Sequence, residues 1–365
     1  MRIALLTSAK GWRGSGASYA KLARGLGERG HLAQLITTAP GLSARLTAEG
    51  LPVTEIPGRN TGPREVWALL RALRRVAAEA IVVDTPRDLR IAALATLLHD
   101  AKIVYRYNLN YRRPRNHLAD RLYSGRVAAC VFQSLFIQED ALRHAAWVAR
   151  VPGYRVPNGY DTARFAPRPE AGKAFRRKWN IPGDALVALT SAKLERNKGH
   201  EVAIDALDRV RRGGIDLIYV VCGDGTRGPE LRSLAEACGL PVRFTGLLEI
   251  DDVVAALAAA DLVVHPSLQE IFPNAVGEAM SCARAVVAVD AGGTGELLGR
   301  DGSSGVLVPP DDSGAIAATI AALLKDHARR AALGAAARRR IESEFSLARM
   351  IDGYEAALEQ VIRRR

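Results

Sequence analysis

Short apolar runs rich in β-branched residues alternate with amphipathic stretches of helical period along most of the chain. The first half contains six such runs, which we expect to be strands, at residues 3–7, 32–37, 53–56, 80–84, 102–107 and 128–132. Helical stretches at residues 17–29, 63–79 and 89–99 lie between them. This β-α-β-α order predicts a doubly wound α/β domain, in which helices cover both faces of a parallel sheet.

The second half repeats this pattern. Its strands are expected at residues 185–190, 217–221, 242–244, 262–265, 285–288 and 306–308, and its helices at 198–212, 228–238, 251–259 and 274–283. A segment rich in proline, glycine and arginine, residues 151–170, is the predicted linker. We therefore expect one domain over residues 1–165, a second over 166–345, and a final helix over 346–365 that packs back on the first domain.

Composition excludes several classes of protein. Of the 365 residues, 48% are hydrophobic and 25% charged, which is typical of a globular chain and not of a disordered one. The longest apolar run, residues 253–264, is interrupted by Asp261 and is shorter than the roughly 20 residues that span a bilayer. The first ten residues resemble a strand and not a leader. The four cysteines lack metal-ligand spacing, so we expect reduced thiols, no metal site and a cytoplasmic protein.

The excess of positive charge lies in the first half. Of 51 Lys+Arg and 39 Asp+Glu residues, 25 and 12 fall within residues 1–165, a balance of +13, whereas the remainder is at −1. The excess is densest at residues 102–126, where tyrosines are interleaved with arginines that include Arg106, Arg112 and Arg113. Such a mixture suits an anionic lipid or glycan, a nucleic acid, or a merely solvated surface. We expect an anionic partner here, and do not expect it to be a nucleic acid.

A glycine-rich loop joins the first strand to the first helix at residues 11–17. Gly14 and Gly16 would let backbone N–H groups approach an anion at the helix N-terminus. The loop is not a dinucleotide fingerprint, because Tyr19 stands where the third glycine belongs and the second strand does not end in an acid. Since any turn from strand to helix favours glycine, this loop alone is weak evidence of a ligand.

Two further segments follow strands of the second domain. Lys193 and Lys198, at a strand end and a helix start, could hold a diphosphate as point charges, or could be ordinary solvated lysines. Glu270 is expected in the loop before a helix that starts near Pro273, and Glu278 about one turn inside it. Both carboxylates would lie at the carboxyl edge of the sheet, where open α/β folds bind ligands, although helix capping is the plainer interpretation. Together, the loop, the lysines and the acids predict a cleft for a diphosphate-linked sugar.

The chain resembles the family 4 glycosyltransferases of GT-B fold over nearly its full length. Glu270 and Glu278, with seven residues between them, are the most specific feature of this resemblance. Other stretches that carry it are VPNGYD at 156–161 followed by Phe165, the segment 193–199, CGDG at 222–225, FTGL at 244–247 and GGTGE at 292–296.

The resemblance implies two Rossmann-like domains facing across a cleft and a retaining transfer from a nucleotide diphosphate-sugar. A UDP-sugar is the favoured donor and a GDP-sugar the alternative, with no cofactor, no required metal and no protein nucleophile. Lys193 and Lys198 would hold the diphosphate and stabilise the leaving group. Glu270 would bind hydroxyls of the transferred sugar and Glu278 those of the ribose. The remaining donor contacts would come from small residues or backbone, at Gly14, Gly16, Leu247, Phe272, Pro273, Asn274 and Ala275.

This sequence departs from the family pattern at two positions. Lys193 stands where the family usually has arginine, which keeps the charge but not the bidentate fork. The histidine that usually follows the fifth strand is missing, and Asn108 is the nearest polar residue that could hydrogen-bond a sugar hydroxyl there. We expect His200 and His265 to be structural.

The sequence thus predicts a retaining hexosyltransferase that glycosylates an anionic glycan or lipid-linked acceptor in cell-envelope polysaccharide or lipopolysaccharide synthesis. Arg106, Arg112 and Arg113 are the candidate acceptor-binding residues, and the basic first domain suggests peripheral contact with the cytoplasmic face of the membrane. Two alternatives stay open. One is a nucleotide-sugar epimerase, which would convert its donor without an acceptor, and the other is a degenerate protein that binds nucleotide sugars without turnover.

Overall fold

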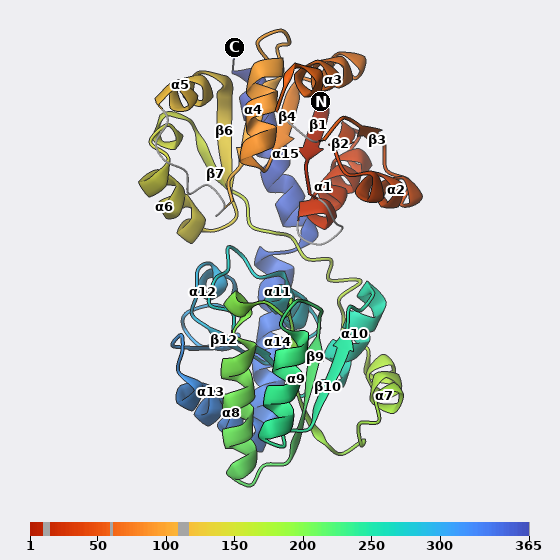
Figure 1. The fold of residues 1–365 in the computed structure, drawn as a ribbon, viewed down its shortest axis with the longest axis vertical. Helices are drawn as coiled ribbons and strands as arrows, with labels where there is room; N and C mark the ends of the chain where they lie inside the picture. Colours follow the sequence, from red (N-terminus) through yellow and green to blue (C-terminus); the bar gives the residue numbers. More distant parts are fainter. Residues whose placement is uncertain (10–14, 59–60, 109–116, 365) are drawn as a thin grey trace. The chain divides into compact units, whose positions relative to one another are not determined.

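A computed structural model of the chain describes residues 1–9, 15–58, 61–108 and 117–364 (Figure 1). The chain forms two compact units. Unit 1 comprises Met1–Gly159 together with Leu347–Arg365, and unit 2 comprises Tyr160–Ser346. The chain passes from unit 1 to unit 2 after Gly159, within the predicted linker.

Unit 1 is built on a seven-stranded parallel sheet with the order β3-β2-β1-β4-β5-β6-β7. The strands are β1 Arg2–Thr7, β2 Leu32–Thr37, β3 Val53–Glu55, β4 Ala80–Val83, β5 Lys102–Arg106, β6 Val127–Phe132 and β7 Gly153–Arg155. Its helices are α1 Ala17–Glu28, α2 Pro40–Ala48, α3 Pro63–Arg75, α4 Pro86–Ala95, α5 His117–Arg126, α6 Leu135–His144 and α15 Leu347–Arg363, with a short 3₁₀ turn at Val148–Arg150. Central strands such as β4 are apolar and buried at every position, as expected for a parallel sheet covered on both faces.

Unit 2 contains a six-stranded parallel sheet with the order β10-β9-β8-β11-β12-β13. The strands are β8 Leu186–Ser191, β9 Leu217–Cys222, β10 Val242–Gly246, β11 Leu262–His265, β12 Val286–Val289 and β13 Val306–Val308. Its helices are α7 Pro169–Lys178, α8 His200–Arg212, α9 Gly228–Ala237, α10 Ile250–Ala259, α11 Asn274–Ser281, α12 Thr294–Leu298, α13 Ser313–Lys325 and α14 His327–Glu344. Two separate apolar clusters occupy the two faces of this sheet, so the prediction of two doubly wound domains is confirmed.

The last helix, α15, belongs to unit 1 (Figure 1). Its buried face, which includes Ile351 and Tyr354, joins the apolar cluster of α1, β1 and β2. Gly25 of α1 makes this packing close, because a Cβ atom at that position would lie 2.6 Å from the Ile351 side chain. On the outer side, His31 Nε2 lies 2.6 Å from Oε1 of Glu355. The helix is thus part of the folded core of unit 1.

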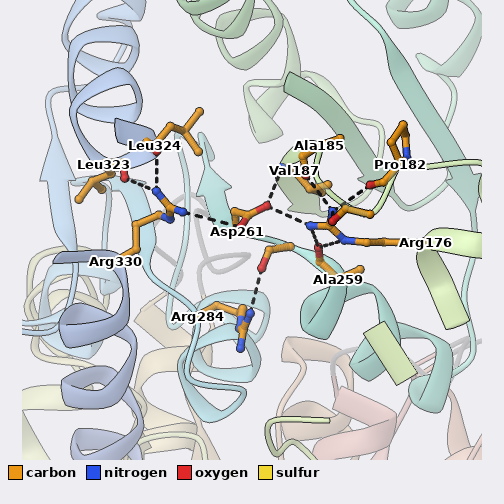
Figure 2. A network of polar contacts seen from close by, with 12 residues as sticks. Arg176, Pro182, Ala185, Val187, Ala259, Asp261, Arg284, Leu323, Leu324 and Arg330 are labelled. Carbon is orange, nitrogen blue, oxygen red and sulfur yellow. Dashed lines mark hydrogen bonds and ion pairs between the residues drawn. The ribbon is translucent and has the colours of Figure 1, made fainter. Parts of the chain in front are cut away.

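Asp261 ties together the amino end of the unit 2 sheet (Figure 2). Its Oδ2 atom accepts hydrogen bonds from Arg176 Nη2 of α7 at 3.0 Å and from the backbone N–H of Val187 at 2.9 Å. Arg330 Nη2 of α14 lies 3.8 Å from Oδ1, while its Nη1 caps the last carbonyls of α13. This network explains the acid that interrupts the apolar run at residues 253–264. Asp261 precedes the first residue of β11, so this network lies at the opposite end of the strand from His265.

Two of the predicted elements are corrected. The segment 198–212 is not one helix, because a 3₁₀ turn over Arg196–Lys198 ends at Gly199 and α8 begins only at His200. The predicted linker contains a strand, since β7 pairs in parallel with β6 from Cys130↔Gly153 to Phe132↔Arg155. Three residues are too few to show an alternating pattern, so only this pairing identifies the strand.

Candidate active site

The order of strands in unit 2 reverses between β8 and β11, the two neighbours at the centre of its sheet. Connections leave these strands toward opposite sides, which opens a crevice at their carboxyl ends where doubly wound folds bind ligands. The loop after β8 carries Lys193 and Lys198, and the loop after β11 carries Glu270. The reversal point therefore brings the two segments together, as the sequence predicts.

Lys198 and Glu270 form an ion pair at this point. Lys198 Nζ lies 2.7 Å from Glu270 Oε1, and the two side chains are only 19% and 14% exposed. The same carboxylate oxygen lies 3.2 Å from Nε2 of His265, the last residue of β11, whose side chain is 4% exposed. Burial raises the pKa of Glu270, but the hydrogen bond and charge of His265 and the charge of Lys198 outweigh it and hold the pKa at about 2. The carboxylate is thus ionised at neutral pH.

His265 is a site residue that the sequence interpretation missed, because it was expected to be structural. The available signal was its place as the last residue of a central strand, five residues before Glu270. His200 does have the structural role expected of it. Its Nε2 donates to the Lys193 carbonyl at 3.0 Å, and burial lowers its pKa, so a neutral imidazole holds the loop after β8.

Lys193 differs from Lys198 in its surroundings. Its side chain is 59% exposed, and its Nζ lies 3.6 Å from Glu195 Oε1. An exposed pair of this kind is weak and easily exchanged for another anion. Lys193 is therefore free to reorient, whereas Lys198 is held in place.

Two glycines let the loops of unit 2 approach one another. Gly199 has a φ of 66° and Gly292 a φ of 57°, both in the left-handed region that other residues avoid. A Cβ atom on Gly199 would lie 2.1 Å from the carbonyl oxygen of Pro266, and one on Gly292 would lie 1.7 Å from that of Glu270. The same Glu270 carbonyl accepts a hydrogen bond from the backbone N–H of Gly293 at 3.2 Å. The GGTGE segment thus positions the backbone of Glu270.

The N-terminus of α11 follows Glu270. Pro273 precedes Asn274, the first helical residue, so the first backbone N–H groups of the helix lack intrahelical acceptors. The Phe272 side chain is buried against Phe345 at 5.5 Å between ring centroids, so it contributes to the core and can offer a ligand only its backbone. Ala275 lies in the first turn and Glu278, which is half-buried, in the second. Leu247, just after β10, is 62% exposed.

In unit 1 the strand order reverses between β1 and β4. Asn108, two residues beyond β5, donates from Nδ2 to the main-chain carbonyl of Asp84 at 2.9 Å. Arg106 is buried, and its Nη2 donates to Asn158 Oδ1 at 2.8 Å. Arg106 is therefore held within the fold and not displayed on a basic surface. Gly16 precedes α1, whereas Gly14, Arg112 and Arg113 lie outside the described residues.

Two general features bear on the chemistry. In the part of the chain that the structure describes, no three His, Cys, Asp or Glu side chains cluster as metal ligands would. Within the same residues, no helix has both the length and the apolar character needed to cross a bilayer.

Two family models match the chain. The model for glycosyl transferases group 1 covers residues 172–340, and that for glycosyltransferase family 4 covers residues 12–164.

Similar proteins include a "GDP-mannose-dependent monoacylated alpha-(1-6)-phosphatidylinositol monomannoside mannosyltransferase" of Corynebacterium glutamicum, with 32% identity over 52% of this chain and 52% of the relative. A "D-inositol 3-phosphate glycosyltransferase" of Salinispora tropica is 36% identical over 50% of this chain and 41% of its own length. An "Alpha-D-kanosaminyltransferase" of Streptomyces kanamyceticus is 30% identical over 73% of this chain and 56% of its own. The chain thus spans about half the length of the curated relatives it matches.

Solved structures match over the full chain at lower identity. A glycosyltransferase from Rickettsia africae has a TM-score of 0.90 and 19% identity, covering 100% of this chain and 99% of the other. The Anabaena protein HepE in complex with UDP has a TM-score of 0.86 and 21% identity, covering 99% of this chain and 100% of the other.

Proposed function

The chain belongs to glycosyltransferase family 4 and has the GT-B fold, and from that premise we propose that it is a retaining glycosyltransferase. Its donor would be a nucleoside diphosphate sugar bound by unit 2, and its acceptor an anionic glycan or lipid-linked molecule bound by unit 1. The observation that carries this proposal is the Lys198–Glu270–His265 cluster at the β8/β11 reversal point.

The cluster suits a sugar diphosphate because it offers a cation for the diphosphate and a carboxylate for the hydroxyl groups of the sugar. Lys198 supplies a positive charge at Glu270, four residues before α11 begins, and a diphosphate bound here would be stabilised by that charge and by backbone N–H groups of the first turn of the helix. Glu270, held ionised by His265 and Lys198, accepts hydrogen bonds from hydroxyl groups. Lys193 is exposed and could turn toward the diphosphate. Glu278 would accept hydrogen bonds from the ribose hydroxyls.

The proposed reaction breaks the bond between the anomeric carbon and the diphosphate oxygen. Negative charge then develops on the leaving diphosphate, and Lys198 stabilises that charge more strongly in the transition state than in the bound donor. In the proposed same-face attack, the leaving phosphate accepts the proton of the acceptor hydroxyl, so no protein nucleophile is assigned. We propose that these cationic side chains suffice without a divalent metal.

The acceptor proposal rests on charge. The first 165 residues carry an excess of 13 positive charges. The Corynebacterium and Salinispora relatives are named for phosphorylated inositol substrates. A phosphorylated polyol, free or lipid-linked, is therefore the class of acceptor to try first, with a role in the cell envelope and at the cytoplasmic face of the membrane as the corresponding proposal.

The test begins with the donor. Thermal unfolding of the full chain is measured with UDP, GDP, ADP and CMP and with their sugars, in EDTA and then in magnesium. A nucleotide at a hundred times its dissociation constant adds about 2.7 kcal/mol to the unfolding free energy. Stabilisation in EDTA by one nucleotide, followed by product with retained anomeric configuration, supports the proposal. Stabilisation without turnover on any acceptor would make the chain a binding protein, and no stabilisation at all would remove unit 2 as a donor site.

A further inference from the structure

Asp84 is the first residue after β4, at the point where the strand order of unit 1 reverses next to β1. Its side chain is 1% exposed. Among the described residues, the Ser15 hydroxyl approaches the carboxylate as a hydrogen-bond donor, but neither carboxylate oxygen has a partner of ordinary geometry. Asp84 is therefore a buried acid whose hydrogen-bonding capacity the described fold leaves mostly unused.

Asp88, four residues further along the chain, is a buried acid in the same region whose hydrogen bonds give it a structural role. It is also buried, but its Oδ2 accepts the backbone N–H of Ser8 at 2.9 Å and its Oδ1 accepts the Ser8 hydroxyl. These bonds join the end of β1 to the start of α4. In the described part of the chain, Asp84 has the Ser15 hydroxyl near its carboxylate but no pair of well-formed bonds such as Asp88 makes, so it does not serve the same purpose.

Several polar groups face Asp84, and the hydrogen bond of one of them, Ser15, satisfies it only in part. They are the Ser15 hydroxyl, Tyr19 of α1, Asp88 of α4, Arg106 of β5 and Tyr354 of α15. Burial raises the pKa of Asp84 to about 6, while the hydrogen bond from Ser15 and the charge of Arg106 lower it and the charge of Asp88 raises it. Arg106 offsets part of the negative charge, but its guanidinium is bound to Asn158. Asp84 is thus ionised above about pH 6 and retains acceptor capacity.

A buried carboxylate with most of its hydrogen-bonding capacity unsatisfied is destabilising, and such groups are concentrated at functional sites. The occupant that would satisfy it here is a neutral O–H donor. A second cation is disfavoured because Arg106 already lies beside the carboxylate. An anionic group is disfavoured because the carboxylate itself would repel it. A sugar or polyol hydroxyl meets this requirement.

We propose that Asp84 accepts a hydrogen bond from a hydroxyl of the acceptor sugar or polyol and so orients that acceptor in unit 1. This inference rests on the proposed glycosyltransferase activity and adds a residue to its acceptor side. Asn108 then acts as a positioning residue, because its amide holds the main chain of Asp84 at 2.9 Å. The sequence interpretation assigned Asn108 to the sugar and did not select Asp84.

The experiment compares Asp84→Asn with the wild type in the full chain. The control variant is Asp140→Asn, which changes a buried carboxylate of α6 in the same unit that has its own partner, His144 Nδ1 at 3.2 Å. D-Inositol 3-phosphate and a panel of free and phosphorylated monosaccharides serve as acceptors. Steady-state rates of transfer and of donor hydrolysis are measured from pH 5 to pH 8, and circular dichroism checks folding.

We expect Asp84→Asn to lower kcat/KM for the acceptor roughly tenfold or more, the effect of losing a hydrogen bond to a charged group. Donor KM and donor hydrolysis should stay within twofold of the wild type. In the wild type, kcat/KM for the acceptor should fall as pH drops through about 6, and this dependence should be missing in the variant. A purely structural role would not move that pH profile.

Each other outcome overturns the inference. Unchanged acceptor kinetics would show that Asp84 does not contact the acceptor, and equal losses for donor and acceptor would place its effect elsewhere. A variant that fails to fold would show that the carboxylate is needed by the fold. If the wild type neither hydrolyses a donor nor transfers to any acceptor, the proposed function itself fails, which is distinguishable from a variant that matches an active wild type.

Discussion

The Nζ atom of Lys198 lies 2.7 Å from Oε1 of Glu270, although the two are 72 positions apart in the chain. The contact exists because β8 and β11 are neighbours in the sheet while β9 and β10 lie on the far side of β8. The cation proposed for the leaving group and the carboxylate proposed for sugar hydroxyls are thus held in contact by the fold of unit 2.

Lys198→Ala should lower kcat about a hundredfold or more while changing donor KM much less, because in the proposed reaction Lys198 acts mainly on charge that develops as the diphosphate leaves. Steady-state kinetics over a range of donor concentrations give both constants. Lys173→Ala is the matched control, since this lysine of α7 is 64% exposed and pairs with Glu170, one turn earlier in the same helix. A loss confined to KM would contradict the leaving-group role.

Glu278→Ala should weaken binding of the nucleotide by about 1–3 kcal/mol, the cost of leaving a hydrogen-bonding group without its partner. Titration calorimetry with UDP and with GDP measures this change directly and also decides between the two bases. Glu236, an exposed glutamate of α9, provides the control variant Glu236→Ala. Equal affinities for the wild type and Glu278→Ala would remove Glu278 from the ribose site.

The elements of both sheets could be predicted because each strand is a local apolar run, and Lys198 and Glu270 could be selected because their loops follow such runs. His265 and Asp84 could not be selected as site residues in this way, because what marks them is their contact with residues distant in sequence. Asp84 is surrounded by groups from α1, β5 and α15. The break at Gly199 was missed for a similar reason, since the close approach of Pro266 requires it.

Asp84→Asn should make the protein more stable at pH 7.5 even as it impairs transfer. The pKa of Asp84 is raised from 3.8 to about 6 by burial, so the folded state holds its proton to a higher pH than the unfolded state. Ionisation of Asp84 therefore lowers the free energy of unfolding as pH rises from about 4 to 6, and this loss stays constant above pH 6. At 1.36 kcal/mol per pKa unit, the variant should gain up to about 3 kcal/mol. Urea unfolding of the variant and the wild type at pH 4 and at pH 7.5 measures this gain. If the two proteins were equally stable at both pH values, the Asp84 carboxylate would be fully satisfied within the fold.

Asp261→Ala tests the fold of unit 2 apart from its site. Removing the acid leaves Arg176 and Arg330, whose side chains are 15% and 8% exposed, without their carboxylate. Breaking a buried pair of this kind costs about 3–5 kcal/mol, and the partial exposure of Asp261 puts the expected loss near the lower figure. Denaturant unfolding measures the loss. Nucleotide affinity below the transition should be unchanged, and a large drop in affinity would mean that the amino end of β11 is coupled to Glu270.

Gly292→Ala should disrupt the site from its backbone. The added Cβ atom would lie 1.7 Å from the Glu270 carbonyl oxygen, so the backbone at Gly292 or at Glu270 must shift, which we expect to disturb the contact between Glu270 and Lys198. Gly302→Ala is a close control, because Gly302 also has a positive φ, 73°, but a Cβ there meets nothing within 4 Å. Both variants carry the backbone cost of alanine in this region, about 1–2 kcal/mol, and only Gly292→Ala adds the collision. We therefore expect similar nucleotide affinity and turnover for Gly302→Ala and the wild type, and at least a tenfold lower donor kcat/KM for Gly292→Ala. Equal activity of the two variants would mean that the position of Glu270 does not limit catalysis.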